Sequence, residues 1–170
     1  DGRPSLDLAI LCPTQGPQFN LGLWRLEDDW EQFGDITGAG QARALAVIDL
    51  TYDGIDDLVV GTSQGFTTVV GRQGSPDIVH DLLVDTVIGE VTRIAAGDLN
   101  FDGYADVIVI ADGIAMQYAN TTDPLDPVAY NSDVAVDAPR DVVIAQLDRD
   151  AYPDLVFSTN AGLLILSLDG

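Results

Sequence analysis

Short apolar runs separated by acidic, glycine-containing turns dominate the hydrophobic pattern of this chain. Three runs, at residues 58–62, 107–111 and 155–159, are rich in β-branched residues and almost continuously apolar. Such runs are typical of strands with both faces buried, because a half-exposed strand alternates apolar and polar residues. No segment keeps a 3.6-residue period over the length of a helix. The pattern predicts an all-β protein, with further inner strands at residues 44–48, 94–97 and 142–145.

The chain is a repeat array with a period of about 49 residues. A nine-residue motif begins at residues 49, 98 and 146, where the sequence reads DLTYDGIDD, DLNFDGYAD and QLDRDAYPD. Each copy has an Arg a few residues upstream, namely Arg43, Arg93 and Arg140. Four short strands per repeat is the size of a propeller blade, so we expect a partial β-propeller of about 3.5 four-stranded blades and about fourteen strands. The expected units are residues 1–42 (partial), 43–92, 93–139 and 140–170 (partial).

The charge of the chain is strongly one-sided. Twenty-eight acidic residues, 25 of them Asp, oppose seven Arg and no Lys, for a net charge of −21. No basic patch for nucleic acid can be assembled, and attraction to an anionic membrane surface fails for the same reason. No apolar stretch approaches the roughly 20 residues that span a bilayer.

The single cysteine and the single histidine exclude several kinds of site. Cys12 alone forms no intrachain disulfide or thiolate zinc site, and His80 alone forms no His-cluster metal site. We expect Cys12, within the apolar run LAILC, to pack as a small hydrophobic residue.

The nine-residue motif carries oxygen ligands at the spacing of a cation-binding loop. Side chains at positions 1, 3, 5 and 9 and the carbonyl at position 7 converge if the chain curls, and Gly at position 6 permits the tight turn. A cation would offset the repulsion between the carboxylates. An all-oxygen set favours Ca²⁺ over transition metals, and over Mg²⁺ with its stricter geometry. The alternative is that Asp, Asn and Gly simply form turns.

The three copies are not equivalent. An EF-hand is excluded for all of them, because the twelfth residues, Val60, Val109 and Phe157, lie in predicted strands where that loop requires Glu. In the third copy Gln146 replaces the first acid and Ala151 replaces the Gly. We therefore predict two well-formed Ca²⁺ sites, at 49–57 and 98–106, and a degenerate third at 146–154.

The pattern D-x-[DNT]-x-D-G-x-x-D followed by an apolar strand resembles the FG-GAP/VCBS repeats of integrin α-subunit propellers, fungal integrin-like lectins and many secreted bacterial proteins. The resemblance extends over nearly all of the chain, while the poorly kept Phe-Gly and Gly-Ala-Pro signatures favour the bacterial-type repeats. It implies structural Ca²⁺ in the inter-strand loops. The implied ligands are the side chains of Asp49, Thr51, Asp53, Asp57, Asp98, Asn100, Asp102 and Asp106, the remaining acids Asp148, Asp150 and Asp154, and the main-chain oxygens of Ile55, Tyr104 and Tyr152.

The resemblance also implies a class of function. It favours a non-enzymatic, extracellular module, secreted, at the cell surface or periplasmic, that binds a protein or a glycan. The alternative is the propeller domain of a secreted polysaccharide-active or other hydrolase or lyase, although no catalytic group of residues is evident. A glycan ligand would use exposed aromatic residues, for which the candidates are Trp24, Trp30, Tyr118 and Tyr130. The sequon at Asn120 has meaning only in a eukaryotic secretory protein. We expect a fragment of a longer chain with flanking repeats.

Overall fold

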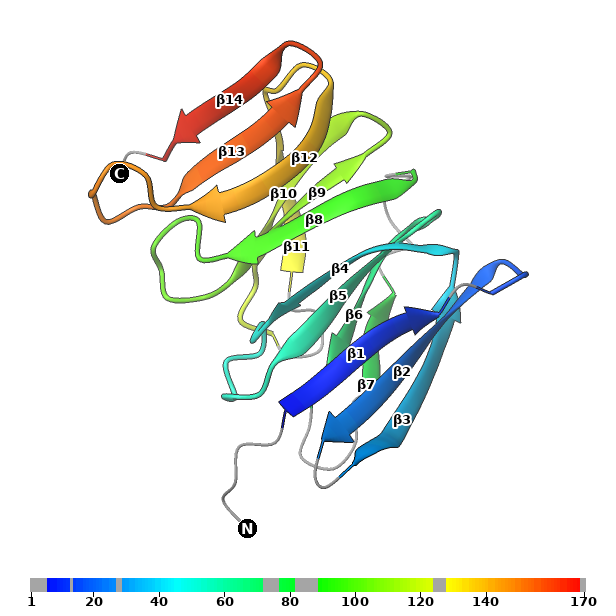
Figure 1. The fold of residues 1–170 in the computed structure, drawn as a ribbon. Helices are drawn as coiled ribbons and strands as arrows, with labels where there is room; N and C mark the ends of the chain where they lie inside the picture. The colour runs from blue at the N-terminus through cyan, green and yellow to red at the C-terminus, as the bar shows by residue number, and fades with distance from the viewer. Residues whose placement is uncertain are drawn as a thin grey trace.

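The computed structural model describes residues 6–12, 14–26, 29–71, 77–81, 89–123 and 128–168. Every regular element in these ranges is a β-strand, and the fourteen strands form four antiparallel sheets (Figure 1). The all-β prediction is confirmed, and each expected inner strand falls within an observed one. In the same described ranges, no helix is long and apolar enough to cross a membrane.

Each sheet is a meander whose strands pair in chain order. The first sheet contains β1 (Leu6–Cys12), β2 (Gln18–Leu26) and β3 (Trp30–Ala39). The second contains β4 (Ala42–Ile48), β5 (Asp57–Thr62), β6 (Gly65–Val70) and β7 (Asp77–Asp81). The third contains β8 (Val91–Gly97), β9 (Asp106–Ala111), β10 (Ile114–Asn120) and β11 (Val128–Val134). The fourth contains β12 (Pro139–Ala145), β13 (Asp154–Thr159) and β14 (Gly162–Ser167).

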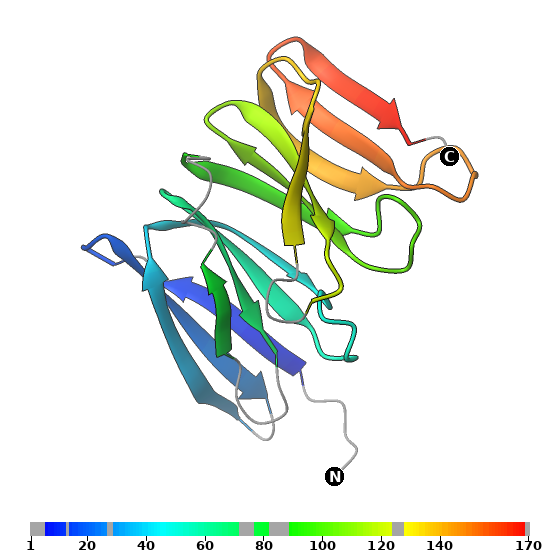
Figure 2. The same cartoon turned by 180° about the vertical axis from the view of Figure 1, so that it is seen from behind.

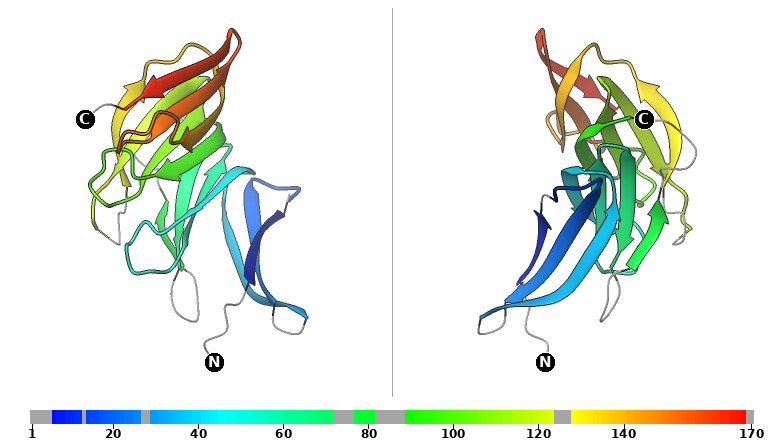
Figure 3. Two further views of the ribbon diagram at one scale, coloured as in Figure 1. Left: turned by 60° about the vertical axis from the view of Figure 1, so that its left-hand side comes forward. Right: turned by 90° about the vertical axis from the view of Figure 1, so that its right-hand side faces the viewer.

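The four sheets stack face to face like blades of a partial propeller, and the side views show them spreading as a fan (Figure 3). The first strands of the last three sheets, β4, β8 and β12, lie next to one another (Figure 1). The last strands, β7 and β11, lie on the far side of the stack, as the view from behind shows (Figure 2). Because a neighbouring sheet covers each face, β5 and β9 are buried along their whole length.

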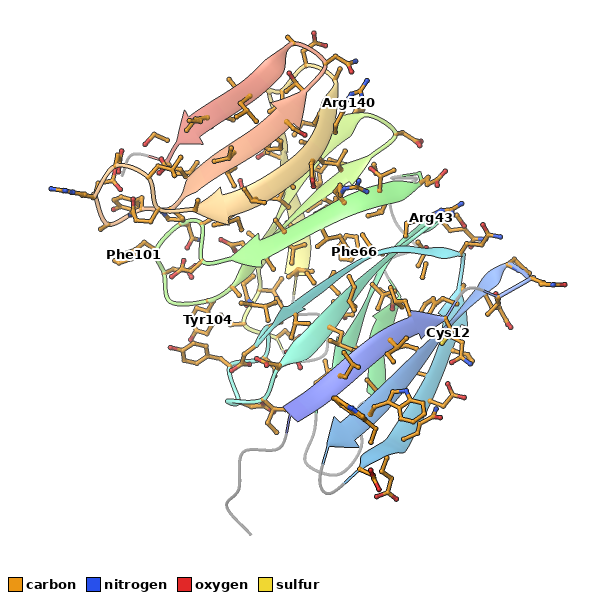
Figure 4. All side chains as sticks on the ribbon, viewed as in Figure 1. Cys12, Arg43, Phe66, Phe101, Tyr104 and Arg140 are labelled. Carbon is orange, nitrogen blue, oxygen red and sulfur yellow. The ribbon has the colours of Figure 1, made fainter. Side chains whose placement is uncertain are left out.

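Apolar side chains fill the three interfaces between successive sheets. The residues of these interfaces include Leu21 and Val60, then Phe66 and Tyr118, then Ile108 and Phe157. In the middle interface the rings of Phe66 and Tyr118 meet edge to face at 4.8 Å between centroids, and Figure 4 shows Phe66 between the second and third sheets. Stacking of blades, and not any single sheet, therefore creates the hydrophobic core.

The Arg of the second and third repeats reaches across to the next sheet. Arg43 Nε lies 2.8 Å from a carboxylate oxygen of Glu90, and Arg93 Nε lies 3.2 Å from one of Asp141. The side chains in both pairs are about half exposed, so each pair contributes at most about 1 kcal/mol. Arg140, at the same place in the fourth sheet, donates to the side chain of Asn160 within its own sheet.

Cys12 is exposed, so the expectation that it packs as a hydrophobic residue is wrong. Strand β1 alternates: Ala9 and Leu11 pack towards the second sheet, whereas Leu8 and Ile10 are exposed. Cys12 continues the exposed row at the end of the strand (Figure 4). An apolar run does not reveal which face of a strand another sheet will cover.

The last sheet has an uncovered apolar face. Leu163 is 77% exposed, and Val143 and Ile165 are each 54% exposed. On β14, Leu163 is the cross-strand partner of the β13 residue that lies four places after Asp154. The equivalent residues in the second and third sheets are Phe66 and Ala115, whose partners lie four places after Asp57 and Asp106. Both of these are fully buried, since another sheet lies over them.

We expect the isolated 170-residue chain to associate in solution through this face, because contiguous exposed apolar surface favours burial against a partner. Small-angle scattering over a concentration series measures the association. The double variant Leu163→Glu/Ile165→Glu should reduce it, whereas Ile114→Glu, at an exposed apolar position on the third sheet, should not. A compact, ring-like monomer that does not associate would contradict the expectation.

Candidate metal centre

The three copies of the motif form the loops between the first and second strands of three successive sheets. Loop 49–57 joins β4 to β5, loop 98–106 joins β8 to β9, and loop 146–154 joins β12 to β13. All three lie in a row on one side of the stack, at the left of Figure 1 in cyan, green and orange. Stacking of the blades thus brings together acidic segments that are about 49 residues apart in the sequence.

Each loop turns through residues with a left-handed backbone. Gly54 and Gly103, at position 6, have φ of 84° and 90°, as the predicted tight turn requires. Position 4 is also left-handed, with φ of 59° at Tyr52, 61° at Phe101 and 83° at Arg149. A left-handed conformation costs a non-glycine residue about 1 kcal/mol or more, and the sequence did not indicate it.

In the first loop the carboxylates at positions 1 and 5 bind backbone amides inside the turn. The amides of Asp53 and Gly54 donate to the two carboxylate oxygens of Asp49 at 3.2 and 2.9 Å. The amide of Ile55 donates to Asp53 Oδ1 at 2.9 Å. These bonds curl the chain and direct both acidic side chains into the loop.

The second loop repeats these bonds. The amides of Asp102 and Gly103 donate to Asp98 at 3.1 and 2.9 Å, and the amide of Tyr104 donates to Asp102 at 2.8 Å. The two loops therefore share one geometry, although their residues differ at positions 3, 4, 7 and 8.

The Asp at position 9 connects each loop to the sheet. In the first loop, Asp57 is fully buried; its Oδ2 accepts from the amides of Leu50 at 2.8 Å and Thr51 at 3.0 Å. Its Oδ1 accepts from the amide of Gly71, just after β6, at 2.7 Å. One carboxylate thus joins the start of the loop to the end of the third strand.

The whole connection recurs in loop 98–106, and its bond to the start of the loop recurs in loop 146–154. Asp106 accepts from the amides of Leu99 at 3.1 Å and Asn120 at 2.8 Å, and Asp154 accepts from the amide of Leu147 at 2.7 Å. Sequence reasoning assigned these acids only as metal ligands and missed their role as acceptors for the backbone. Their place directly before an almost continuously apolar run was the available sequence signal.

The buried carboxylates have perturbed acidity. Burial raises the pKa of Asp57 and of Asp106, and the backbone hydrogen bonds oppose the rise. The negative charges of Asp49, in the first loop, and of Asp102 and Asp98, in the second, raise the pKa further. A nearby positive charge would favour the ionised form of both carboxylates.

Position 3 tests whether the loops suit a cation. In loop 49–57, Thr51 Oγ1 is buried and has no hydrogen-bond partner in the described part of the chain. A buried hydroxyl of this kind requires a partner, and a cation within the loop would supply one. In loop 98–106, the side chain of Asn100 binds Asp102 twice. Its Oδ1 accepts from the Asp102 amide at 2.9 Å, and its Nδ2 donates to Asp102 Oδ2 at 2.8 Å. All candidate donors are oxygen atoms, which suits Ca²⁺.

The predicted ligands of each site are brought into one turn but are not arranged as a ready-made cage. Among the residues with described positions, no three His, Cys, Asp or Glu side chains are placed to hold a metal ion together. The same carboxylates already accept hydrogen bonds from backbone amides: in loop 49–57 amides donate to Asp49, Asp53 and Asp57. The ligand roles assigned from the sequence stay predictions.

In the third loop, the side chain of Gln146 forms hydrogen bonds to two main-chain carbonyl groups. Gln146 Nε2 donates to the carbonyl oxygens of Asp150 at 2.7 Å and Tyr152 at 2.8 Å. The carbonyl of Tyr152 is the one assigned to a metal by the motif. A neutral amide thus binds the Tyr152 carbonyl oxygen that a cation would otherwise coordinate. Asp148 is fully exposed, and the amide of Asp150 lowers its pKa.

Asn120 joins the first two loops. Its Nδ2 donates to the carbonyl oxygens of Leu50, in loop 49–57, and Ala105, in loop 98–106, at 3.0 Å each. A glycan attached at Nδ2 would remove at least one of these two bonds. The sequon at Asn120 therefore coincides with a structural side chain.

The aromatic residues that were predicted from the sequence as candidates for glycan binding differ in solvent accessibility. Tyr118 is only 1% exposed and packs between sheets, so the structure excludes it as a surface platform. Trp24 is half-buried. Trp30 and Tyr130 remain exposed, and the Tyr130 hydroxyl donates to Asp133 at 3.2 Å.

Residues 91–119 match the family model of the FG-GAP repeat. The match begins at the first residue of β8, includes loop 98–106 and β9, and ends within β10. It therefore contains one complete candidate loop with the strands on both sides.

Proposed function

We propose that this chain, which carries an FG-GAP repeat at residues 91–119, is a non-enzymatic extracellular Ca²⁺-binding propeller module for interaction with a protein or a glycan. FG-GAP repeats are propeller blades, and the four stacked sheets have that architecture. The ion would be structural, and the ligand would bind to the loops on the propeller faces. Secretion or a cell-surface position is part of the proposal.

One observation carries the Ca²⁺ assignment: two loops of different sequence adopt the same geometry around inward-turned carboxylates. Ordinary turn formation explains Gly at position 6. The backbone hydrogen bonds account for acceptors at positions 1, 5 and 9, and a cation would in addition offset the repulsion between acids at all three positions of both loops. The buried, unpartnered hydroxyl of Thr51 is a second, independent observation that supports the same assignment.

Each site would draw on one loop. In the first loop the ligands would be the side chains of Asp49, Thr51, Asp53 and Asp57 and the carbonyl of Ile55. In the second, they would be the side chains of Asp98, Asn100, Asp102 and Asp106 and the carbonyl of Tyr104. The bound ion would supply the positive charge that offsets carboxylate repulsion. Because several of these acids lie at the surface, we expect affinities of about 10⁻⁴–10⁻³ M, as in extracellular modules.

Calorimetric titration of the wild-type chain with millimolar Ca²⁺ is expected to show two sites, and chelation is expected to lower the melting temperature. Asp102→Ala should remove one site, because it deletes the ligand at position 5 of loop 98–106. Asp35→Ala changes the net charge equally at an exposed position on β3 and should keep both sites. An absence of Ca²⁺ binding at millimolar concentration would show that the metal assignment is wrong.

The partner is tested separately. A glycan array probed with the intact protein, in Ca²⁺ and in EDTA, is expected to show Ca²⁺-dependent binding if the ligand is a glycan. A negative array in Ca²⁺ would direct the search to protein ligands. Trp30→Ala and Tyr130→Ala test whether the exposed aromatic residues form the platform.

A further inference from the structure

Aromatic rings connect the three loops across the boundaries between sheets. The ring centroids of Tyr52 and Tyr104 lie 5.0 Å apart, and those of Phe101 and Tyr152 lie 5.5 Å apart. Both pairs are tilted, at 51° and 57°. Each pair joins position 4 of one loop to position 7 of the next. Figure 4 labels the two aromatic residues of the middle loop, Phe101 and Tyr104, and these belong to different pairs.

The residue at position 4 contributes little to its own sheet. Tyr52 is 65% exposed and Phe101 is 60% exposed, so neither ring is part of the core. Both residues also have the left-handed backbone, with φ of 59° and 61°. Arg149, at position 4 of the third loop, has the same left-handed backbone, so this conformation belongs to the turn itself. The contact that both side chains share is the one to the next loop.

The residue at position 7, whose ring contacts the preceding loop, also takes part in the hydrogen bonds of its own loop. Tyr104 donates its amide to Asp102 at 2.8 Å, and Tyr152 donates its amide to Asp150 at 2.9 Å. The carbonyls of the same two residues are the main-chain oxygens assigned to a metal. A restraint on the ring at position 7 therefore also restrains two backbone groups of that residue. One is the amide that donates to a candidate ligand at position 5, and the other is the carbonyl, which is itself a candidate ligand.

A polar contact accompanies the rings at the first boundary. Asn120 Nδ2 binds one carbonyl from each of the two loops, Leu50 O and Ala105 O. Loops 49–57 and 98–106 are thus joined by an amide on the inner side and by two rings at the surface. Two independent contacts at one boundary argue against an incidental meeting of exposed side chains.

We infer that the aromatic residue at position 4 is a positioning residue for the next loop: Tyr52 holds Tyr104 in place, and Phe101 holds Tyr152. The consequence for Ca²⁺ affinity rests on the proposed function, whereas the mechanical connection does not. Each contact joins position 4 of one loop to position 7 of the following loop. Removing the Tyr52 ring should therefore perturb the site in loop 98–106.

The metal-dependent test isolates the second site. In an Asp53→Ala background, which removes the first site, calorimetry measures Ca²⁺ binding to loop 98–106 alone. Tyr52→Asn deletes the ring, and Asn tolerates the left-handed backbone, so the fold should be retained. We expect the affinity of loop 98–106 to fall about two- to tenfold, the factor that corresponds to an aromatic pair. Tyr52→Phe should restore it, and Ile114→Ala, at an exposed position on the third sheet, should leave it unchanged.

The metal-independent test separates this inference from the proposed function. Hydrogen exchange in EDTA, followed by mass spectrometry, measures the opening of loop 98–106 without any ion. Tyr52→Asn should accelerate exchange at residues 102–104, and Tyr52→Phe should not. If the wild-type chain binds no Ca²⁺, the proposed function fails and this experiment still decides the inference. Unchanged exchange in loop 98–106, or acceleration confined to loop 49–57, would overturn it.

Discussion

Asp57→Ala is expected to lower the free energy of unfolding by about 3 kcal/mol or more in the absence of Ca²⁺. The fully buried carboxylate accepts hydrogen bonds from three amides, those of Leu50, Thr51 and Gly71. Alanine accepts none of them, and each buried donor left without a partner costs about 1–3 kcal/mol. Denaturation with urea in EDTA measures the change and keeps any metal effect out of the comparison.

Asp53→Ala is the matched control within the same loop. Asp53 is exposed and accepts the amide of Ile55, so we expect a change below about 1 kcal/mol without Ca²⁺. Asp57→Asn retains one acceptor oxygen and should fall between the two alanine variants. Equal effects of Asp53→Ala and Asp57→Ala in EDTA would mean that Asp57 acts only as a ligand and not as an acceptor for the backbone.

The double variant Gln146→Asp/Ala151→Gly is expected to gain a Ca²⁺ site. In the wild-type chain, Gln146 donates to the carbonyls of Asp150 and Tyr152, and the Tyr152 carbonyl is an oxygen atom that a cation would need. Aspartate removes the donors and adds an acid at position 1, and glycine permits the left-handed backbone at position 6. Asp148, Asp150 and Asp154 already stand at positions 3, 5 and 9. Calorimetric titration should show three sites where the wild type shows two.

Single variants separate the two changes. Ala151→Gly keeps Gln146 and should leave two sites. Gln146→Ala removes the amide without adding an acid, and should loosen loop 146–154 while creating no strong site. A wild-type chain that already binds three ions, or a double variant that still binds two, would contradict the role given to Gln146.

The sequence by itself determined the strands and the position of the loops. Continuous apolar runs bounded by Asp, Asn and Gly identify buried strands, because both signals are local properties of the chain. The repeat then predicted that equivalent segments fold alike, which the matched hydrogen bonds of loops 49–57 and 98–106 confirm. Local signals also identified the acids at positions 1 and 5 as residues that turn into the loop.

Only the tertiary structure decided which residues meet across blades. Asn120 binds the carbonyl of Leu50, seventy residues away. The contact between Tyr52 and Tyr104 likewise joins two repeats. These pairings depend on the spacing and the register of the stacked sheets, and the pattern of residues along the sequence predicts neither. For the same reason the apolar run around Cys12 did not reveal that its side chain would face outward: burial depends on which face the neighbouring blade covers.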